Sequence, residues 1–289
     1  MTVPRIDRRG FFTGRPDGEP GLAVFLNAGD LPWPVLTEVA AMLDERGVEC
    51  LELAVPFPGS PTDGEVIRAS ARRALEHGTD LAATLAFVRE IRPRLRCTRI
   101  ALLADWSCTI RPEPLPGFLA AVRDSGADAL LPHGLPPRLK RDFHESAARA
   151  GLPIVTTCYP ASDARTRRWA VEHGTAYLYL VAGYGRSGVP RDYAALAPVI
   201  AELGGGPPGA PVVSEPREGP PVAVGFGVRE RADVVALHRA GADAVIVGSA
   251  FVARAETARS SGGNVAARLD HYLSTLRSTA TATDPESTR

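Results

Sequence analysis

The sequence predicts an α/β protein in which eight parallel strands alternate with helices and close into a (β/α)8 barrel. Eight short apolar runs recur along the 289 residues, and each is followed by a longer segment with apolar residues at helical spacing. The runs are apolar throughout rather than alternating, which is typical of parallel strands covered on both faces. Eight strands are the number that closes a barrel, and a barrel of about 250 residues forms one domain.

The expected strands are residues 22–27, 49–55, 98–104, 127–131, 153–158, 176–181, 221–225 and 243–247. The first expected helix begins at Pro34 and ends before Gly47, since proline favours a helix start and glycine a helix end. We expect a single barrel domain over residues 1–278. Residues 279–289 (TATATDPESTR) have almost no apolar side chains, so we expect a disordered tail there.

Three of the strands are introduced by nearly identical turns, at residues 46–53 (RGVECLEL), 125–132 (SGADALLP) and 240–247 (AGADAVIV). In each turn a glycine follows the helix, as a left-handed helix end requires, and an acidic residue precedes the strand. This recurrence indicates a repeated βα module. An open three-layer sheet would use the same module, so the number of strands is what favours the barrel.

Composition and charge argue against several classes of function. A hydrophobic content of 45% supports one sizeable core, and a formal net charge of zero removes the electrostatic case for nucleic acid or an anionic membrane as partner. The chain shows no apolar leader and no run long enough to span a bilayer, so we expect a cytoplasmic protein. The four cysteines lack C-x-x-C spacing, and three lie in or beside apolar runs, which predicts buried free thiols.

Glycines follow the last two expected strands, at Gly225-Phe226-Gly227 and Gly248-Ser249. In such barrels functional groups collect where the strands end, and the loops after strands seven and eight commonly bind phosphate. Glycine lets backbone N–H groups approach an anion, a following helix N-terminus adds a favourable dipole, and Ser249 adds a hydroxyl donor. Tight turns alone would also explain either pair. Their occurrence after both strands favours a TIM barrel of the phosphate-binding type.

Glu52 lies inside an apolar run, between Leu51 and Leu53, so we expect its side chain in the barrel interior or mouth. A buried carboxylate is costly unless it is paired, and burial raises its pKa, which suits a general acid and base. A structural carboxylate bonded to nearby backbone is the alternative. Asp63 follows in the loop after the same strand, and a loop that folds over the site would give two carboxyl groups in unlike environments.

Two features argue against two kinds of catalysis that barrel enzymes use. Lys140 is the only lysine, and it falls in a helical stretch after the fourth strand rather than at a strand end, which disfavours a Schiff base. No His/Asp cluster with ligand spacing is present in the sequence, so we expect no catalytic metal.

Several motifs, taken in order, resemble the α subunit of tryptophan synthase. LELAVPFPGSPTDG at residues 51–64 resembles the family signature LELGIPFSDPLADGP, and FLNAGD at 25–30 resembles FVTLGDP. YLYLVAGYGRSG at 177–188 resembles YTYLLSRAGVTG, and GFGV at 225–228 and GSAFV at 248–252 resemble the phosphate loops. The match runs from about residue 20 to residue 275. The combined order is specific, although no single fragment is.

The resemblance implies retro-aldol cleavage of indole-3-glycerol phosphate to indole and glyceraldehyde 3-phosphate, without a cofactor. Glu52 matches the general acid that protonates indole C3, and Asp63 matches the carboxylate that stabilises positive charge on the indole nitrogen and removes its proton. Tyr179 matches a tyrosine near the glycerol moiety, and Phe25 an aromatic residue of the indole pocket. The other matches are Ser187, for a threonine that contacts the loop-two aspartate, and the phosphate-loop residues Gly188, Gly227, Gly248 and Ser249.

The sequence departs from the family pattern in four loops. In loop two SDPLA becomes PGSPT at residues 58–62, which removes an acidic residue used at the contact with the β subunit. Loop six has Gly183 at the arginine position, with an arginine three residues later. Strand three ends in Asp105-Trp106 where a tyrosine-containing segment is usual, and strand four ends in His133 where an aspartate is usual. We interpret His133 as an ordinary loop histidine rather than a catalytic residue.

These departures leave the carboxyl pair and the phosphate loops intact but fall on surfaces that face a β partner. Our hypothesis is therefore a divergent paralogue that acts as a stand-alone indole-3-glycerol-phosphate lyase, and a tryptophan synthase β subunit stays open as a partner. Two alternatives stay open. One is another phosphate-sugar barrel enzyme, an isomerase or epimerase, and the other is a non-catalytic barrel that binds a β-type partner.

Overall fold

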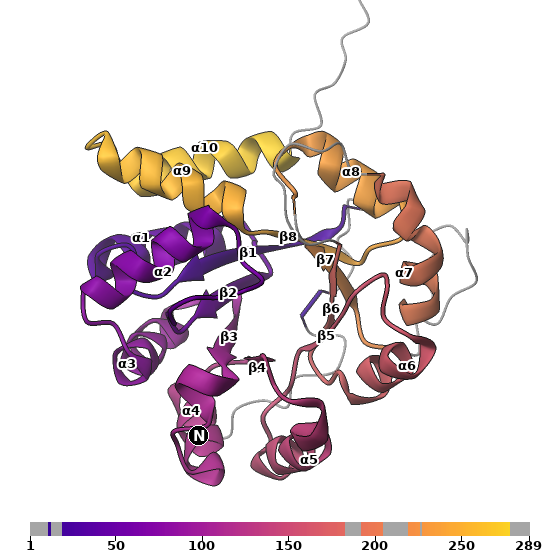
Figure 1. Cartoon of the computed structure of the whole chain (residues 1–289). Helices are drawn as coiled ribbons and strands as arrows, with labels where there is room; N and C mark the ends of the chain where they lie inside the picture. Colours follow the sequence, from indigo (N-terminus) through magenta and orange to yellow (C-terminus); the bar gives the residue numbers. More distant parts are fainter. Residues whose placement is uncertain (1–10, 13–18, 183–191, 205–218, 226, 278–289) are drawn as a thin grey trace, which may run out of the picture.

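The computed structural model describes residues 11–12, 19–182, 192–204, 219–225 and 227–277. Its eight strands form one parallel sheet in the order β4-β3-β2-β1-β8-β7-β6-β5. A bridge between Leu130 and Ile154 joins the two ends of this sheet, between β4 and β5. Figure 1 shows the strands at the centre with the helices around them. The predicted (β/α)8 barrel is confirmed.

The strands are β1 Gly21–Asn27, β2 Cys50–Ala54, β3 Arg99–Asp105, β4 Ala129–His133, β5 Thr156–Cys158, β6 Leu178–Val181, β7 Val222–Gly225 and β8 Ala244–Val247. The helices are α1 Trp33–Glu45, α2 Glu65–Glu76, α3 Leu81–Ile91, α4 Leu115–Ser125, α5 Lys140–Ala150, α6 Ala164–His173, α7 Ala197–Gly204, α8 Arg231–Arg239, α9 Ser249–Ser260 and α10 Val265–Arg277. Every expected strand is present, with bounds shifted by a few residues. Within the described ranges, no helix combines the length and the apolar character needed to cross a membrane. The expected tail at residues 279–289 lies outside the described residues.

The three similar turns adopt the predicted geometry. Their glycines have left-handed backbone angles, with φ of 61° at Gly47, 90° at Gly126 and 98° at Gly241. The acidic residue that follows accepts a 2.8 Å hydrogen bond from a backbone N–H of the neighbouring strand, in the pairs Glu49–Leu22, Asp128–Ile100 and Asp243–Val222. Before β6, the hydroxyl oxygen of Thr175 accepts an equivalent 2.8 Å hydrogen bond from the backbone N–H of Ile154. The repeated turn therefore fixes the amino ends of four strand pairs.

Side chains of the strands alternate between two apolar layers. Outward-facing residues such as Leu22, Val24 and Leu26 pack against the helices. The inward-facing residues nearest the amino ends are small, namely Ala23, Cys50, Ala101, Ala129, Ala223 and Ala244. The rings of Phe11 and Phe12 fill the space that these leave, 5.3 and 5.2 Å from the ring of Tyr177. The amino-terminal half of the barrel is thus a packed core, and polar groups collect above it.

The four cysteines are free thiols, but the expectation of burial is only partly right. Cys50 and Cys158 are buried, whereas Cys97 and Cys108 are exposed. Cys97 lies in the turn before β3, and Cys108 lies in a short π-helical turn after it, Trp106–Ile110. An apolar run does not bury the residues beyond its ends, because the chain turns to the surface there.

Candidate active site

Glu52 and Phe25 point into the barrel from neighbouring strands. They are paired in the register of β1 and β2. Two residues earlier in the same strands, Ala23 and Cys50 belong to the interior cluster, and side chains two apart in a strand face the same way. Glu52 is only 1% exposed. The sequence-based expectation that its side chain lies inside the barrel is therefore correct.

The partner of Glu52 is a tyrosine side chain that the sequence analysis did not identify. The hydroxyl of Tyr177 donates a hydrogen bond to Glu52 Oε1 at 2.5 Å. Burial raises the pKa of Glu52 to about 7, and the Tyr177 hydrogen bond opposes this rise by stabilising the charged form. Tyr177 and Tyr179 are two residues apart and therefore share a face, so strand alternation was the signal that could have found it.

Tyr179 lies at the end of the barrel near both predicted carboxyl groups. Burial, and after it the charges of Glu52 and Asp63, hold the pKa of Tyr179 well above its ordinary range. Its ring packs directly over Gly225 of β7, where an added Cβ would lie 2.6 Å from the tyrosine hydroxyl oxygen. Gly225 therefore leaves the space in which the Tyr179 ring sits.

Asp63 lies in loop two, which we define as residues 55–64 between β2 and α2. Its side chain is partly exposed, in contrast to the buried Glu52. Its backbone carbonyl accepts a 2.9 Å hydrogen bond from Arg68 on α2. The charges of both Asp63 and Glu52 raise the pKa of Tyr179, and the two carboxyl groups lie in unlike environments, one partly exposed and one buried.

Gly227, Gly248 and Ser249 lie at the ends of the adjacent strands β7 and β8. Gly227 has a left-handed φ of 91°. Gly248 precedes α9, whose first residue is the exposed Ser249, so the helix N-terminus opens at the strand ends. A Cβ on Gly248 would lie 3.8 Å from Cβ of Phe25, so the loop after β8 lies next to Phe25 of β1. The remaining predicted ligands, Ser187 and Gly188, lie outside the described residues.

His133 lies in a strand and not in a loop, which corrects its place in the sequence-based interpretation; no contact shows a catalytic role. It is the last residue of β4 and both of its ring nitrogens have partners. Nδ1 lies 3.0 Å from Oδ2 of Asp105, and Nε2 lies 3.1 Å from the hydroxyl oxygen of Thr62 in loop two. The other oxygen of Asp105 accepts backbone hydrogen bonds of 2.9 Å from Ser107 and Cys108. Three of the departures from the family pattern therefore meet in one hydrogen-bonded group.

Lys140 is the first residue of α5, in agreement with its predicted place in a helix. Its ammonium nitrogen lies 4.7 Å from the ring centre of Trp169 on α6, a cation–π distance. In the described part of the chain, no group of three or more His, Cys, Asp and Glu residues is arranged to hold a metal ion.

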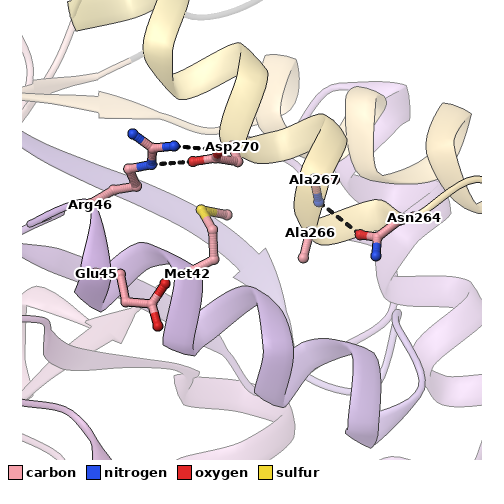
Figure 2. A pocket seen from close by; sticks show the side chains of 7 residues that line it. All are labelled: Met42, Glu45, Arg46, Asn264, Ala266, Ala267 and Asp270. Atoms are coloured by element: carbon pink, nitrogen blue, oxygen red, sulfur yellow. Dashed lines mark hydrogen bonds and ion pairs between the residues drawn. The ribbon is translucent and has the colours of Figure 1, made fainter.

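A hollow of about 230 Å³ lies between α1 and α10, away from these residues. Figure 2 shows its lining, which is Met42, Glu45, Arg46, Asn264, Ala266, Ala267 and Asp270. Arg46 and Asp270 form an ion pair beside it. Because α1 ends here just before β2 begins, the hollow is on the amino-end side of the barrel, opposite the carboxyl ends of the strands.

Replacement of Tyr177 by phenylalanine tests the origin of the Glu52 pKa. The substitution removes the hydroxyl that stabilises the charged form, so the pKa of Glu52 should rise above its value of about 7. An NMR titration of the labelled Glu52 carboxyl carbon measures this directly. Tyr272→Phe is the matched control, since Tyr272 donates to the Arg229 carbonyl instead and should leave the Glu52 titration unchanged. An unchanged or lowered pKa in Tyr177→Phe would contradict the assignment.

Comparison with known proteins agrees with this geometry. The family model described as tryptophan synthase alpha chain matches residues 11–281. The tryptophan synthase alpha chain of Burkholderia thailandensis is 34% identical over 262 residues, which are 90% of this chain and 91% of the relative. That of Caulobacter sp. strain K31 is 30% identical over 92% of both chains. A solved structure of the tryptophan synthase α2β2 complex from Pyrococcus furiosus holds a chain that is 28% identical, with a TM-score of 0.75 over 89% of this chain and 98% of that chain. The chain therefore belongs to the tryptophan synthase alpha chain family.

Proposed function

We propose that this protein cleaves indole-3-glycerol phosphate to indole and glyceraldehyde 3-phosphate, and that it does so without a cofactor and without a β subunit. This cleavage, a carbon–carbon lyase reaction, is the activity of the tryptophan synthase alpha chain family. In this chain one observation supports it above all. Glu52 is a carboxyl group buried inside the barrel with a pKa of about 7, so it both gives and takes a proton near neutral pH.

The order of the strands supports one orientation of the substrate. The neighbours β7, β8, β1 and β2 follow one another around the barrel. In this proposal the phosphate binds to backbone N–H groups at Gly227 and Gly248, and to Ser249 at the N-terminus of α9. The indole ring then packs against Phe25 of β1, and its C3 atom reaches Glu52 of β2.

The chemistry requires an acid at indole C3 and a negative charge near the indole nitrogen. Protonated Glu52 donates its proton to C3, which becomes tetrahedral, and positive charge appears on the nitrogen. The carboxylate of Asp63 stabilises that charge electrostatically. The hydroxyl on the carbon attached to C3 then returns a proton to Glu52 and forms the aldehyde, and the electrons of the broken C–C bond restore the indole ring. Tyr179, close to both carboxyl groups, contacts the glycerol moiety.

Loop two supports the stand-alone part of the proposal. The solved relative from Pyrococcus furiosus belongs to an α2β2 complex described by mutual activation. In this chain, residues 58–62 lack the acidic residue that family members use towards β, and Thr62 of the same loop is bonded to His133 of its own barrel. The loop thus lacks the family's acidic residue at position 59 and, three residues later, is bonded within its own barrel.

Steady-state indole release tests both parts. Purified protein with indole-3-glycerol phosphate should release indole alone, and addition of a tryptophan synthase β subunit should change the rate by less than about twofold. Negligible release alone with strong activation by β would refute the stand-alone part. Absence of indole in both reactions, with substrate bound or converted to an isomer, would refute the lyase proposal itself.

A further inference from the structure

Three residues from two strand ends and one loop form one hydrogen-bonded network, which we call the Asp105–His133–Thr62 network. Asp105 ends β3, His133 ends β4 and Thr62 lies in loop two. The strand register pairs Asp105 with His133, so the two side chains emerge side by side from the barrel. Their contacts, at 3.0 and 3.1 Å, have hydrogen-bond geometry. The network therefore joins loop two to the ends of β3 and β4.

Asp105 orients the imidazole ring of His133. A carboxylate only accepts hydrogen bonds, so Nδ1 of His133 carries the proton on that side. In the neutral ring Nε2 is then an acceptor, and the hydroxyl of Thr62 donates to it. Asp105 is itself held by the backbone N–H groups of Ser107 and Cys108, and Gly134 leaves it room, because an added Cβ there would lie 3.2 Å from Oδ2.

Loop two contacts His133 at a second point and is anchored at its far end. The ring of Phe57, near the start of the loop, lies 5.3 Å from the His133 ring. Beyond the loop, α2 is fixed by the buried Asp30, which accepts hydrogen bonds from Ser70 at 2.6 Å and from Arg73 at 2.7 Å. The start of the loop is thus held by packing and the helix after it by an ion pair, while Thr62 bonds the later part of the loop to His133 and Arg68 bonds the Asp63 carbonyl.

We propose that the Asp105–His133–Thr62 network is a positioning device for the lyase reaction, which holds loop two over the barrel mouth so that Asp63 faces the substrate without a second protein. Asp63 follows Thr62 directly, so any movement of the Thr62 backbone moves the Asp63 carboxylate. The inference rests on the proposed stand-alone function and supplies its structural basis. None of the three residues contacts the reacting atoms in this scheme; each acts through the position of Asp63.

The hydroxyl of Thr62 gives the sharpest test. Thr62→Val removes the hydroxyl at nearly constant shape, whereas Thr62→Ser keeps it. Thr62→Val should lower kcat for indole release on the order of tenfold with little change in KM, because a misplaced Asp63 weakens stabilisation of the transition state more than substrate binding. Thr62→Ser should restore most of kcat. If the unmodified protein releases indole and Thr62→Val has the same kcat, the inference is overturned. The lyase proposal then still stands.

A double substitution shows whether Thr62 and His133 act as a unit. His133→Ala should lower kcat at least as much as Thr62→Val does, and the double variant should be no worse than His133→Ala alone, since that substitution already removes the contact with Thr62. Independent, multiplying losses would contradict a shared contact. Thr257→Val is the control for loss of a threonine hydroxyl elsewhere. Thr257 bonds to the Ala253 carbonyl on the exposed side of α9, and its replacement should leave kcat unchanged.

Hydrogen exchange separates this inference from the proposed function, since it needs no turnover. Backbone amides of residues 57–64 should exchange faster in Thr62→Val and His133→Ala than in the unmodified protein, and Thr62→Ser should stay close to the unmodified rate. Unchanged exchange in all variants would overturn the inference even if the protein cleaves its substrate. Faster exchange in a protein that releases no indole alone would support the network as a loop anchor and refute only the stand-alone function.

Discussion

Glu52→Gln is expected to lower indole release by about 10²–10⁴-fold, because an amide neither donates a proton to indole C3 nor takes one from the glycerol hydroxyl. The substitution keeps the size of the side chain and its acceptor for the Tyr177 hydroxyl. Binding of a non-reactive phosphorylated indole analogue should therefore persist. Turnover by the variant is measured in the indole assay, and analogue binding by calorimetry.

The same substitution should make the protein more stable at alkaline pH. The pKa of Glu52 is about 7 in the folded protein against an ordinary value of 4.5, so the folded state holds this proton more tightly. Stability is consequently lost as the pH rises from about 4.5 to about 7, and the full penalty applies above that. The difference in pKa corresponds to roughly 3 kcal/mol at pH 8. Urea unfolding at pH 5 and pH 8 should show Glu52→Gln gaining stability chiefly at pH 8.

Glu38→Gln serves as the control for loss of a carboxylate, because Glu38 is exposed on α1 and its replacement should leave turnover unchanged. Retained turnover in Glu52→Gln would contradict the acid–base role. A variant less stable than the unmodified protein at pH 8 would contradict the desolvation of Glu52 and leave its catalytic role to be judged by turnover alone.

Gly225→Ala should impair both the stability and the activity of the protein through Tyr179. The added Cβ would lie 2.6 Å from the Tyr179 hydroxyl oxygen and 2.8 and 2.9 Å from two ring carbons, so the rigid ring must move. Overpacking of this kind costs about 1–3 kcal/mol. Displacement of Tyr179 from the two carboxyl groups should lower kcat on the order of tenfold or more. Urea unfolding and the indole assay measure the two effects.

Two comparisons establish whether Tyr179 transmits the effect of Gly225→Ala. In a Tyr179→Ala background the clash is gone, so Gly225→Ala should add little further loss of stability or kcat. The same additional loss in both backgrounds would show that the damage arises elsewhere. Gly117→Ala, in α4 with nothing within 4 Å of an added Cβ, is the matched control and should gain about 0.5–1 kcal/mol from better helix propensity.

Much of the fold followed from local sequence. The eight apolar runs predicted eight strands, since a strand buried on both faces must be apolar at every position. The glycines at 47, 126 and 241 predicted three left-handed helix ends, because few other residues adopt positive φ without strain. The burial of Glu52 also followed from the sequence, because a residue in the middle of an apolar strand that is covered on both faces is buried whichever way it points.

Contacts between segments that are distant in sequence were decided only by the tertiary structure. Tyr177 reaches Glu52 because closure of the barrel brings β6 across the interior from β2, and residues 125 positions apart then share one hydrogen bond. The pairing of Asp105 with His133 depends on the register of β3 and β4, and a shift of one residue would turn both side chains to the other face. No local pattern encodes that register, so His133 resembled an ordinary loop histidine.

The sequence by itself determined the barrel, the buried acid on β2 and the glycine loops after β7 and β8, because each depends on the chemistry of a short segment. The tertiary structure decided which partners those groups have. It placed Tyr177 beside Glu52, and it joined three unusual residues of loops two, three and four into one network. The physical reason for the difference is range. The hydrophobic pattern of a strand depends only on neighbouring residues in the sequence, whereas hydrogen bonds between strand ends and loops form only after the barrel has closed and brought them together.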